Sequence, residues 1–569
     1  MDRIWLGTYP PGVPVEIDTD EYASINDMVA RTCHKYARLP AFRNFGVTIT
    51  FAQVDRLSRD FAAWLQSLPG LCRGSRVALM MPNVLQYPIA LLGTLRAGMI
   101  VVNINPLYTA RELEGQLKDS GAQAIVILEN FAHVLESVLP KTAVEHVVTT
   151  GIGDLFPAPK RWLTNLVVKR VRKMVPAWHI EHAVGFRTAL QRGARATWDE
   201  PAAGHDDIAF LQYTGGTTGV SKGAVLTHGN IVANVLQGTA WTSPVIEEGR
   251  ETMVTALPLY HIFSLTTNCL LCMNKGALNL LITNPRDMRG FVKELRKSHF
   301  TLITGVNTLF NGLLHTPGFA GLDFSGLKVS LGGGAAVQRV VAERWREVTG
   351  NNLVQGYGLT ETSPFVSCNL FNTEYNGTVG PPMPSTEVAI LDDEDREVAL
   401  GHEGEICVRG PQVMQGYWQR PEETENAMTP DGWLRTGDIG VIDERGFLRI
   451  TDRKKDMILV SGFNVYPNEV ESVVAAHPGV TECAVIGVPD RTSGEAVKAF
   501  IVRKDPDLTP ESVVAFCRQN LTNYKLPRQI EFRNDLPKNQ IGKVLRRELR
   551  PAQVESSTED SRAAKSVGK

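Results

Sequence analysis

The sequence contains no apolar run long enough to cross a membrane as a helix. The longest apolar stretch, residues 86–106, is interrupted by Gly, Arg and Pro, whereas a spanning helix needs about 20 continuous apolar residues. Residues 1–18 also lack the apolar core of a secretory signal peptide. We therefore expect a cytoplasmic protein, with peripheral binding to the inner face of the cell membrane left open.

Cysteine is scarce, and its spacing shows no disulfide framework. The eight cysteines are scattered, which suits a reducing compartment. Cys269 and Cys272 have CxxC spacing, but no second pair or nearby His completes the four ligands that zinc needs. Core cysteines are the favoured interpretation, and redox chemistry is the alternative.

The chain also lacks an excess of charge of either sign. Its formal net charge is -2, so nothing predicts binding to nucleic acid. With 569 residues, the chain is too long for one hydrophobic core, because cores stop growing near about 300 residues. Two or more domains are expected.

The order of apolar runs predicts an α/β protein. Strand-like runs alternate with amphipathic helices, which favours mostly parallel sheets covered by helices; the runs are residues 75–81, 99–105, 122–128, 300–306 and 327–334. Frequent turn signals at 381–450 predict a small antiparallel β-subdomain. We predict a large domain at 1–451, a smaller mobile α+β domain at 452–550 and a disordered tail at 551–569.

Residues 160–175 form an unusual basic segment. It carries six basic residues and no acidic one. Its apolar residues recur at helical spacing, namely Leu163, Val167, Val171 and Met174. Such a helix can lie on an anionic membrane surface. A solvated helix that packs on its own protein is an equally favoured interpretation.

A run of small residues follows the strand-like segment DIAFLQ. Its glycines allow backbone amides to surround an anion, and its hydroxyls and lysine add donors; the run is Tyr213, Thr214, Gly215, Gly216, Thr217, Thr218, Gly219, Val220, Ser221, Lys222, Gly223 and Ala224. The pattern predicts a triphosphate loop between a strand and a helix. It differs from the Walker A pattern, and a flexible linker is disfavoured.

Seven ordered motifs give the run a more specific meaning. YTGGTTGVSKGAVLTH resembles the signature of the acyl-adenylate-forming (AMP-binding) superfamily. Further motifs follow in that family's order from about residue 25 to 550: PLYHIF (258–263), GGGAAV (332–337), QGYGLTET (355–362), DGWLRTGD (431–438), DRKKDMILVSGFNVYP (452–467) and PKNQIGKVLRREL (537–549). The motif DGWLRTGDIG with FLRITDRKKD resembles bacterial long-chain fatty-acid–CoA ligases in particular.

The resemblance implies a two-step ligase. A fatty acid and ATP would give an acyl-adenylate and diphosphate, and coenzyme A would then take the acyl group. Fatty acid, ATP and CoA are the implied substrates, with Mg²⁺ as cofactor. The alternatives are a ligase for aromatic, medium-chain or amino acids, an adenylation enzyme with a separate carrier protein, and a non-catalytic nucleotide- or fatty-acid-binding protein.

Catalytic roles follow from the same resemblance. Glu361, with Thr360, is expected to hold Mg²⁺, and Lys222 to contact the phosphates. Lys543 matches the lysine that contacts the carboxylate and the α-phosphate during adenylation. His261 is expected to line the acyl and thiol side, with a core histidine as the alternative.

The resemblance also assigns nucleotide-binding positions. Tyr357 is expected to stack on adenine, Asp438 to bind the ribose, and Arg453 to reach ribose or phosphate. The other positions matched are Gly333, Gly334, Ala335, Gln355, Gly356 and Gly358. Ser461, Gly462 and Phe463 match the loop for thioester formation, with a hinge near Lys455. The acyl pocket is expected to draw on residues 230–240, 258–263 and 305–335; a homodimer is left open.

Overall fold

The computed structural model describes residues 3–214, 221–461, 463–490, 492–539 and 542–550. The chain divides into two compact units, Met1–Lys455 and Asp456–Lys569, a division slightly later than the one predicted at 451/452. Across the described residues, every helix is too short or too polar to span a bilayer.

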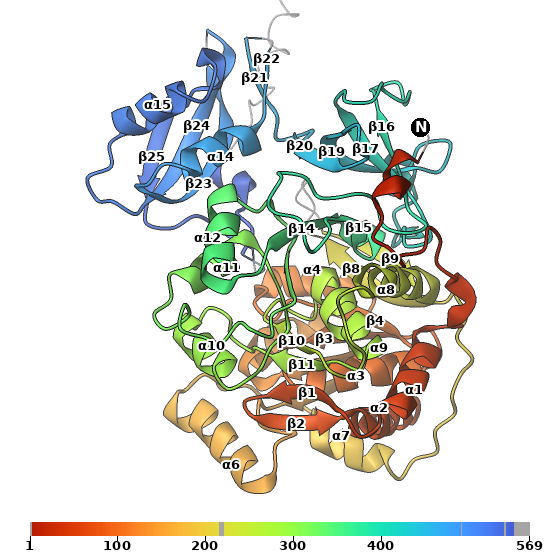
Figure 1. Cartoon of the computed structure of the whole chain (residues 1–569). Coiled ribbons are helices and arrows are strands. Elements are labelled where there is room, and N and C mark those ends of the chain that lie inside the picture. Colours follow the sequence, from red (N-terminus) through yellow and green to blue (C-terminus); the bar gives the residue numbers. More distant parts are fainter. Residues whose placement is uncertain (1–2, 215–220, 462, 491, 540–541, 551–569) are drawn as a thin grey trace, which may run out of the picture. The chain divides into compact units, whose positions relative to one another are not determined.

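The first unit contains two eight-stranded sheets that are mostly parallel (Figure 1). The first sheet has antiparallel pairs only at its two edges, and its strands, in spatial order, are β15 (Phe365–Cys368), β14 (Leu353–Gly358), β13 (Val329–Gly332), β12 (Leu302–Gly305), β10 (Thr252–Thr255), β11 (Leu278–Leu281), β1 (Pro40–Asn44) and β2 (Val47–Thr50). Its central strands are buried along their length, as expected for parallel strands covered on both faces.

The second sheet is parallel except at one end, where β9 runs antiparallel to both of its neighbours. Its strands, in spatial order, are β18 (Gly416–Tyr417), β9 (Lys222–Thr227), β8 (Ile208–Thr214), β4 (Ile100–Asn103), β3 (Arg76–Met80), β5 (Ala124–Leu128), β6 (His146–Thr150) and β7 (Val184–Gly185). The alternation of strands and helices predicted from the sequence is confirmed.

Helices cover these sheets and join their strands. In the described part of the first unit, the α-helices are α1 (Ile25–Lys35), α2 (Phe51–Gln66), α3 (Gln86–Arg96), α4 (Ala110–Ser120), α5 (Ala132–Val138), α6 (Ala158–Leu166), α7 (Phe186–Gly193), α8 (His228–Thr242), α9 (Cys272–Asn274), α10 (Met288–Leu295), α11 (Asn307–Leu314), α12 (Arg339–Thr349) and α13 (Pro421–Ala427), with π-helical segments η5 (Val167–Val171) and η6 (Ser264–Leu271). Every residue of α3 is buried, so α3 is a central helix with no solvent face.

The antiparallel β-subdomain predicted at 381–450 is confirmed. Its four-stranded sheet has the order β16 (Glu387–Leu391), β17 (Gly404–Arg409), β19 (Leu434–Ile442) and β20 (Leu448–Arg453), and every pair is antiparallel. The tight turn between β19 and β20 contains Gly446 at φ 81°, a conformation that glycine adopts without steric cost.

The second unit is an α+β domain with its own core. Its strands are β21 (Ile458–Val460), β22 (Phe463–Val465), β23 (Val480–Asp490), β24 (Gly494–Arg503) and β25 (Gln529–Arg533), packed against α14 (Pro467–Ala475) and α15 (Pro510–Arg518). Buried aliphatic residues from both helices and from these strands form one cluster, which is what allows such a unit to fold compactly.

Candidate active site

The glycine-rich run is a hairpin loop, so the prediction that it joins a strand to a helix was wrong. Thr214 at the end of β8 pairs with Lys222 at the start of β9, and the Ser221 hydroxyl donates to the Thr214 carbonyl at 2.6 Å. Residues Lys222–Thr227 extend as a buried strand because their apolar side chains pack in the sheet. Helix α8 starts only after Thr227, which caps it. Residues 215–220 lie outside the described residues.

Tyr213 and Gly223 face each other across the base of this hairpin. A Cβ on Gly223 would lie 3.1 Å from the Tyr213 ring, so the ring covers the glycine closely. The Tyr213 hydroxyl donates to Oδ2 of Asp119 at 2.7 Å, and Arg420 donates to Oδ1 of the same carboxylate at 2.5 Å. The tyrosine at the loop's edge is therefore fixed at both of its ends.

Glu361 and Lys222, predicted from separate motifs, meet at one tyrosine. The Tyr417 hydroxyl donates to Oε1 of Glu361 at 2.7 Å, and Lys222 Nζ lies 5.3 Å from the centre of the Tyr417 ring. Burial, together with the neighbouring Glu361, raises the pKa of Tyr417, so the phenol stays protonated and donates. Tyr417 was not predicted from the sequence, because it lies outside the matched motifs. The dipeptide Gly416-Tyr417 between two turns is the only local pattern that marks it.

Tyr357, Asp438 and Arg453 form a second polar cluster. The Tyr357 hydroxyl donates to Oδ2 of Asp438 at 2.7 Å, and Arg453 Nε lies 3.1 Å from Oδ1. Asp438 and Arg453 are cross-strand partners on β19 and β20. The structure thus brings together three residues that the sequence places in three motifs.

The segment GGGAAV is held by a buried glutamine. Gln355 Oε1 accepts from the Val337 amide at 2.9 Å, and its Nε2 donates to the Thr378 carbonyl at 3.2 Å. A Cβ on Gly333 would lie 2.9 Å from the Phe263 ring, so the glycine permits close approach of the PLYHIF segment. Gln355 therefore positions this loop through its side chain.

On β14, neighbouring atoms leave little space for a side chain at Gly356 and Gly358. A Cβ on Gly358 would lie 1.8 Å from the Pro364 carbonyl oxygen, and one on Gly356 would lie 3.3 Å from Leu331. Thr360 begins a short 3-10 turn with Glu361, and the Glu361 carbonyl accepts from the Met414 amide at 2.8 Å. In the loop 332–337, Gly334 has φ 75° and is exposed, and Ala335 is half-buried.

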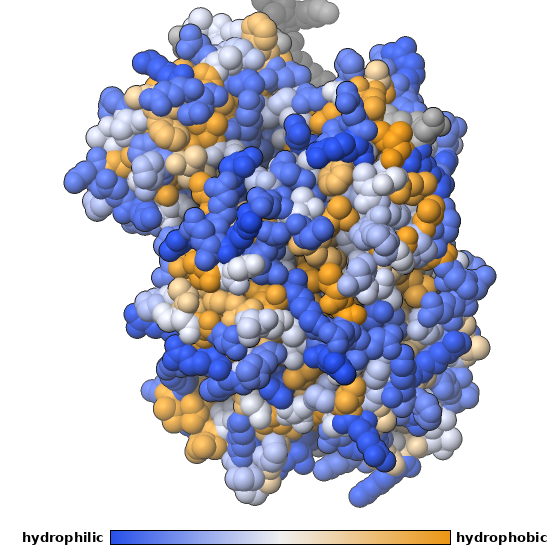
Figure 2. Space-filling model, in the orientation of Figure 1, coloured by the Kyte–Doolittle hydropathy of each residue, from blue (hydrophilic) through white to orange (hydrophobic). Residues whose placement is uncertain are grey.

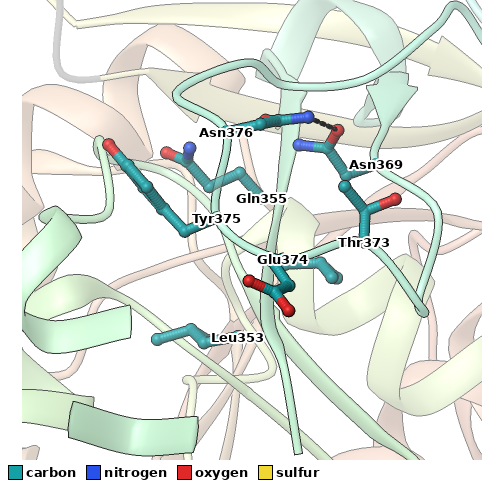
Figure 3. A pocket seen from close by; sticks show the side chains of 8 residues that line it. Leu353, Gln355, Asn369, Thr373, Glu374, Tyr375 and Asn376 are labelled. Carbon is teal, nitrogen blue, oxygen red and sulfur yellow. Dashed lines mark hydrogen bonds between the residues drawn. The ribbon is translucent and has the colours of Figure 1, made fainter. Parts of the chain in front are cut away.

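A shallow hollow lies beside Gln355 (Figure 3). It encloses about 170 Å³ including its open side, and it is lined by Leu353, Val354, Gln355, Asn369, Thr373, Glu374, Tyr375 and Asn376. Its amides pair with each other, as Asn376 does with Asn369 at 3.5 Å, and Arg339 lies over the Tyr375 ring. Most of its lining side chains are polar, with Leu353 and Val354 as the aliphatic ones.

His261 lies in the PLYHIF turn, half-buried. Its Nδ1 accepts from the Phe263 amide at 3.3 Å, and its backbone carbonyl accepts from Leu265 at the start of η6. The side chain therefore has a local structural role, and its expected role beside the thiol stays a prediction.

A larger, apolar cavity lies between α8, η6 and the first sheet. It encloses about 450 Å³ including its open side and is lined by Gly238, Trp241, Thr242, Ile246, Met253, Thr267, Leu271, Cys272, Leu302, Thr304, Val329, Leu331, Phe365, Cys368, Phe371 and Met383. None of these side chains is charged. Of the three predicted segments, 230–240 and 305–335 contribute walls, whereas η6 and β15 were not anticipated.

The remaining predicted residues belong to the second unit. Lys543 closes a small loop, in which its amide donates to the Asn539 side chain at 2.8 Å and its carbonyl accepts from the Asn539 amide at 2.7 Å. Ser461 has φ 52°, and Phe463 is 57% exposed while its ring stacks on Tyr524 at 4.9 Å. Gly462 lies outside the described residues.

Comparison with protein families identifies the family of this chain. Residues 29–418 match the family described as AMP-binding enzyme, and residues 469–543 match the AMP-binding enzyme C-terminal domain. The chain belongs to the AMP-binding enzyme family. The glycine-rich hairpin and Glu361 fall within the first of these regions, and Lys543 ends the second.

Among family members, bacterial relatives match over almost the whole chain. A long-chain-fatty-acid–CoA ligase of Escherichia coli O157:H7 is 59% identical over 97% of this chain and 98% of its own. One from Yersinia pestis is 57% identical over 99% and 100%. The crystal structure of ATP-bound MatB from Rhodopseudomonas palustris superposes with a TM-score of 0.78, at 28% identity, over 92% of this chain and 98% of that one.

The eight cysteines are free thiols, and seven of them are buried. Burial raises the pKa of Cys269 to about 12 and also raises that of Cys272. A thiol with a raised pKa ionises only above neutral pH, and the thiolate is the reactive form. The interpretation of the CxxC pair as core cysteines is supported by this burial.

This burial predicts the thiol titration of the native protein. At about pH 8, an aromatic disulfide reagent should label one thiol per chain quickly, namely the exposed Cys72, and all eight only after denaturation. Cys72→Ser should remove the fast phase. Rapid labelling of two further thiols, one lost in Cys269→Ser and the other in Cys272→Ser, would contradict the account and favour the redox alternative.

Proposed function

We propose that this chain is an AMP-forming long-chain fatty acid–CoA ligase. The fatty carboxylate oxygen attacks the α-phosphorus of ATP, which gives acyl-AMP and releases diphosphate. The CoA thiol then attacks the acyl carbon, loses its proton and displaces AMP. The observation that carries this proposal is the identity of 57–59% to such ligases over nearly full length.

The first unit would hold ATP through its two polar clusters. Lys222 and the hairpin loop beside it would receive the phosphates, because a lysine is a compact cation. Asp438, held by Tyr357 and Arg453, keeps acceptor capacity for ribose hydroxyls, since each carboxylate oxygen has two lone pairs. The loop 332–337, which Gln355 holds through the Val337 amide, would lie beside the adenine base.

Glu361 fits the role of Mg²⁺ ligand. Among the described residues, no group of three or more His, Cys, Asp or Glu side chains is placed to hold a metal ion. A single carboxylate is normal when substrate phosphates supply the other ligands. Only Oε1 of Glu361 has a partner within the described chain, which leaves Oε2 for the ion. Bound Mg²⁺ would neutralise phosphate charge.

The C-terminal unit would supply Lys543 to adenylation. Two anions must meet in this step, and a lysine that contacts both lowers their repulsion. Ser461 and Phe463, with Gly462 between them, would serve thioester formation in a second arrangement about a hinge near Lys455. Two arrangements of a small domain are a known way to complete two half-reactions.

The apolar cavity would receive the acyl chain. It is walled by aliphatic, aromatic and sulfur side chains without a charge, so a hydrocarbon chain gains about 25 cal/mol for each Å² removed from water. Gly238 forms part of the wall on α8. A Cβ at this position would lie 2.3 Å from Leu271 and 3.5 Å from Phe365, so any larger residue there enters the space between them.

The segment 158–174 would hold the enzyme on an anionic membrane. No residue of α6 or η5 is buried. The exposed apolar side chains are Trp162 (67%), Leu163 (62%), Leu166 (55%), Val171 (68%) and Met174 (54%). Figure 2 shows an apolar cluster where Figure 1 places α6, at the lower left. The six basic residues of this segment complement an anionic surface.

Several polar contacts attach this segment to its own protein. Lys160 donates to the Phe45 carbonyl, and Lys169 lies 3.7 Å from Glu129. Asn165 donates to Asp154 at 2.8 Å and accepts from the Gly153 amide at 2.9 Å. With these contacts made, Trp162, Leu163 and Leu166 stay exposed. The observation favours the membrane interpretation over a helix packed on its own protein, and a long-chain substrate that partitions into lipid suits such a location.

Lys543→Ala should abolish thioester formation from palmitate, ATP, Mg²⁺ and CoA. We expect a loss of about 10²–10³-fold in rate, the usual effect of removing one group that stabilises developing charge. The same variant should still make thioester from supplied palmitoyl-AMP, because that step does not need the lysine. Lys504→Ala, an exposed lysine of the same unit, is the control.

Chain-length specificity should respond to Gly238→Met. The larger side chain fills the cavity, so kcat/KM for palmitate should fall at least about tenfold relative to octanoate. Gly115→Met is the matched control, because Gly115 lies on α4 with open space around it. An unchanged palmitate-to-octanoate ratio would show that the chain binds elsewhere. Benzoate as preferred substrate would favour an aromatic-acid ligase.

Membrane binding should depend on both kinds of side chain in α6–η5. We expect two double variants to weaken cosedimentation with phosphatidylglycerol-containing vesicles. The apolar variant carries Trp162→Gln and Leu166→Gln, and the charge variant carries Lys169→Gln and Arg170→Gln. The charge variant should lose roughly thirtyfold in partition coefficient, at about 1 kcal/mol per basic residue. Val340→Gln, an exposed apolar residue of α12, is the control. Equal binding of wild type to neutral and anionic vesicles would contradict the proposal.

A further inference from the structure

Tyr417 lies on the edge strand of the second sheet, between two residues of the proposed ATP site. Its strand, β18, pairs with β9 through Gly416–Val225 and Tyr417–Ala224. The flanking amides of Gln415 and Trp418 donate to carbonyls of β9 at 3.1 and 2.8 Å. The backbone of Tyr417 is therefore fixed to the strand that begins at Lys222.

The same backbone is also fixed from its other side. The Tyr417 amide donates to the Thr424 hydroxyl at 2.9 Å, and its carbonyl accepts from the Arg420 amide at 3.2 Å. Arg420 is in turn paired with Asp119. The tyrosine ring thus extends from a backbone that is held without the side chains of Glu361 or Lys222.

The hydroxyl of Tyr417 constrains the carboxylate of Glu361. Its 2.7 Å hydrogen bond to Oε1, together with the 2.8 Å bond from the Met414 amide to the Glu361 carbonyl, fixes the residue at both its backbone and its side chain. Mg²⁺ demands near-ideal octahedral geometry. A carboxylate ligand held by a hydrogen bond loses less freedom on binding the ion than a free one does.

The ring of Tyr417 constrains Lys222 in a different way. The ammonium lies 5.3 Å from the ring centre, within the range of a cation–π contact. A cation over a ring face keeps its other donors for an anion on the opposite side. One side chain therefore contacts both the residue proposed for the metal and the residue proposed for the phosphates.

We infer that Tyr417 is a positioning residue for the Mg²⁺–ATP complex: its hydroxyl orients Glu361 and its ring orients Lys222. The inference rests on the proposed function. Its two contacts are separable by substitution, because phenylalanine keeps the ring and removes the hydroxyl, whereas leucine removes both. The two variants should consequently affect binding of the ion and binding of the phosphates differently.

The test is equilibrium binding of α,β-methylene-ATP by calorimetry, in Mg²⁺ and in EDTA, without fatty acid. The ratio of the Kd in EDTA to the Kd in Mg²⁺ should fall roughly tenfold in Tyr417→Phe, as expected when a partner of a metal ligand is lost. Its Kd in EDTA should stay near that of wild type. Tyr417→Leu should weaken binding a further two- to fivefold or so in both conditions, from loss of the cation–π contact.

Tyr36→Phe is a chemically matched control. The Tyr36 hydroxyl donates to Glu248 at 2.9 Å, and Lys35 lies over its ring at 5.0 Å, so the same three residue types meet away from the site. This variant should bind the nucleotide as wild type does. A wild-type Kd ratio in Tyr417→Phe, or equal weakening in Mg²⁺ and EDTA, would overturn the inference. Thioester synthesis by the wild type would show that the proposed function survives that result.

Discussion

The antiparallel pairing of β18 with β9 is the contact on which the charged part of the site depends. Through it, residues 414–418 are joined to the strand that begins with Lys222, and the Met414 amide joins them to Glu361. These backbone hydrogen bonds fix the position of the segment without any contribution from the Tyr417 side chain. The position of Tyr417 on this strand brings its hydroxyl to Glu361 and its ring to Lys222.

The residues proposed to bind the phosphates and the cavity proposed for the acyl chain share one continuous piece of chain. Strand β9 leaves the glycine-rich hairpin, and α8 follows it directly, with Thr227 as the cap that separates them. Gly223 on the strand faces Tyr213, whereas Gly238 on the helix borders the apolar cavity. A ligase must hold a triphosphate and a hydrocarbon chain within reach of one another, and consecutive elements provide this without a long connection.

The sequence predicted most of the fold, because strand and helix periodicities are local. The parallel sheets, the antiparallel subdomain and the C-terminal α+β unit are all confirmed. The prediction of a helix directly after the glycine-rich run was wrong. The strand β9 stands there instead, and its apolar run is too short for periodicity to distinguish a strand from a helix. Contacts such as Tyr417–Glu361 join residues 56 positions apart, and η6 is buried on all sides, so neither could be placed without the structure. The disordered tail and the homodimer stay predictions.

The most direct test of the ligase account is isotope exchange between diphosphate and ATP in the absence of CoA. Reversible adenylation predicts that exchange requires palmitate or oleate together with Mg²⁺, and that it proceeds without CoA because the thiol enters only in the second step. Exchange that needs CoA, or ATP binding with no exchange in the presence of any fatty acid, would contradict an acyl-adenylate intermediate and leave a nucleotide-binding protein on this fold.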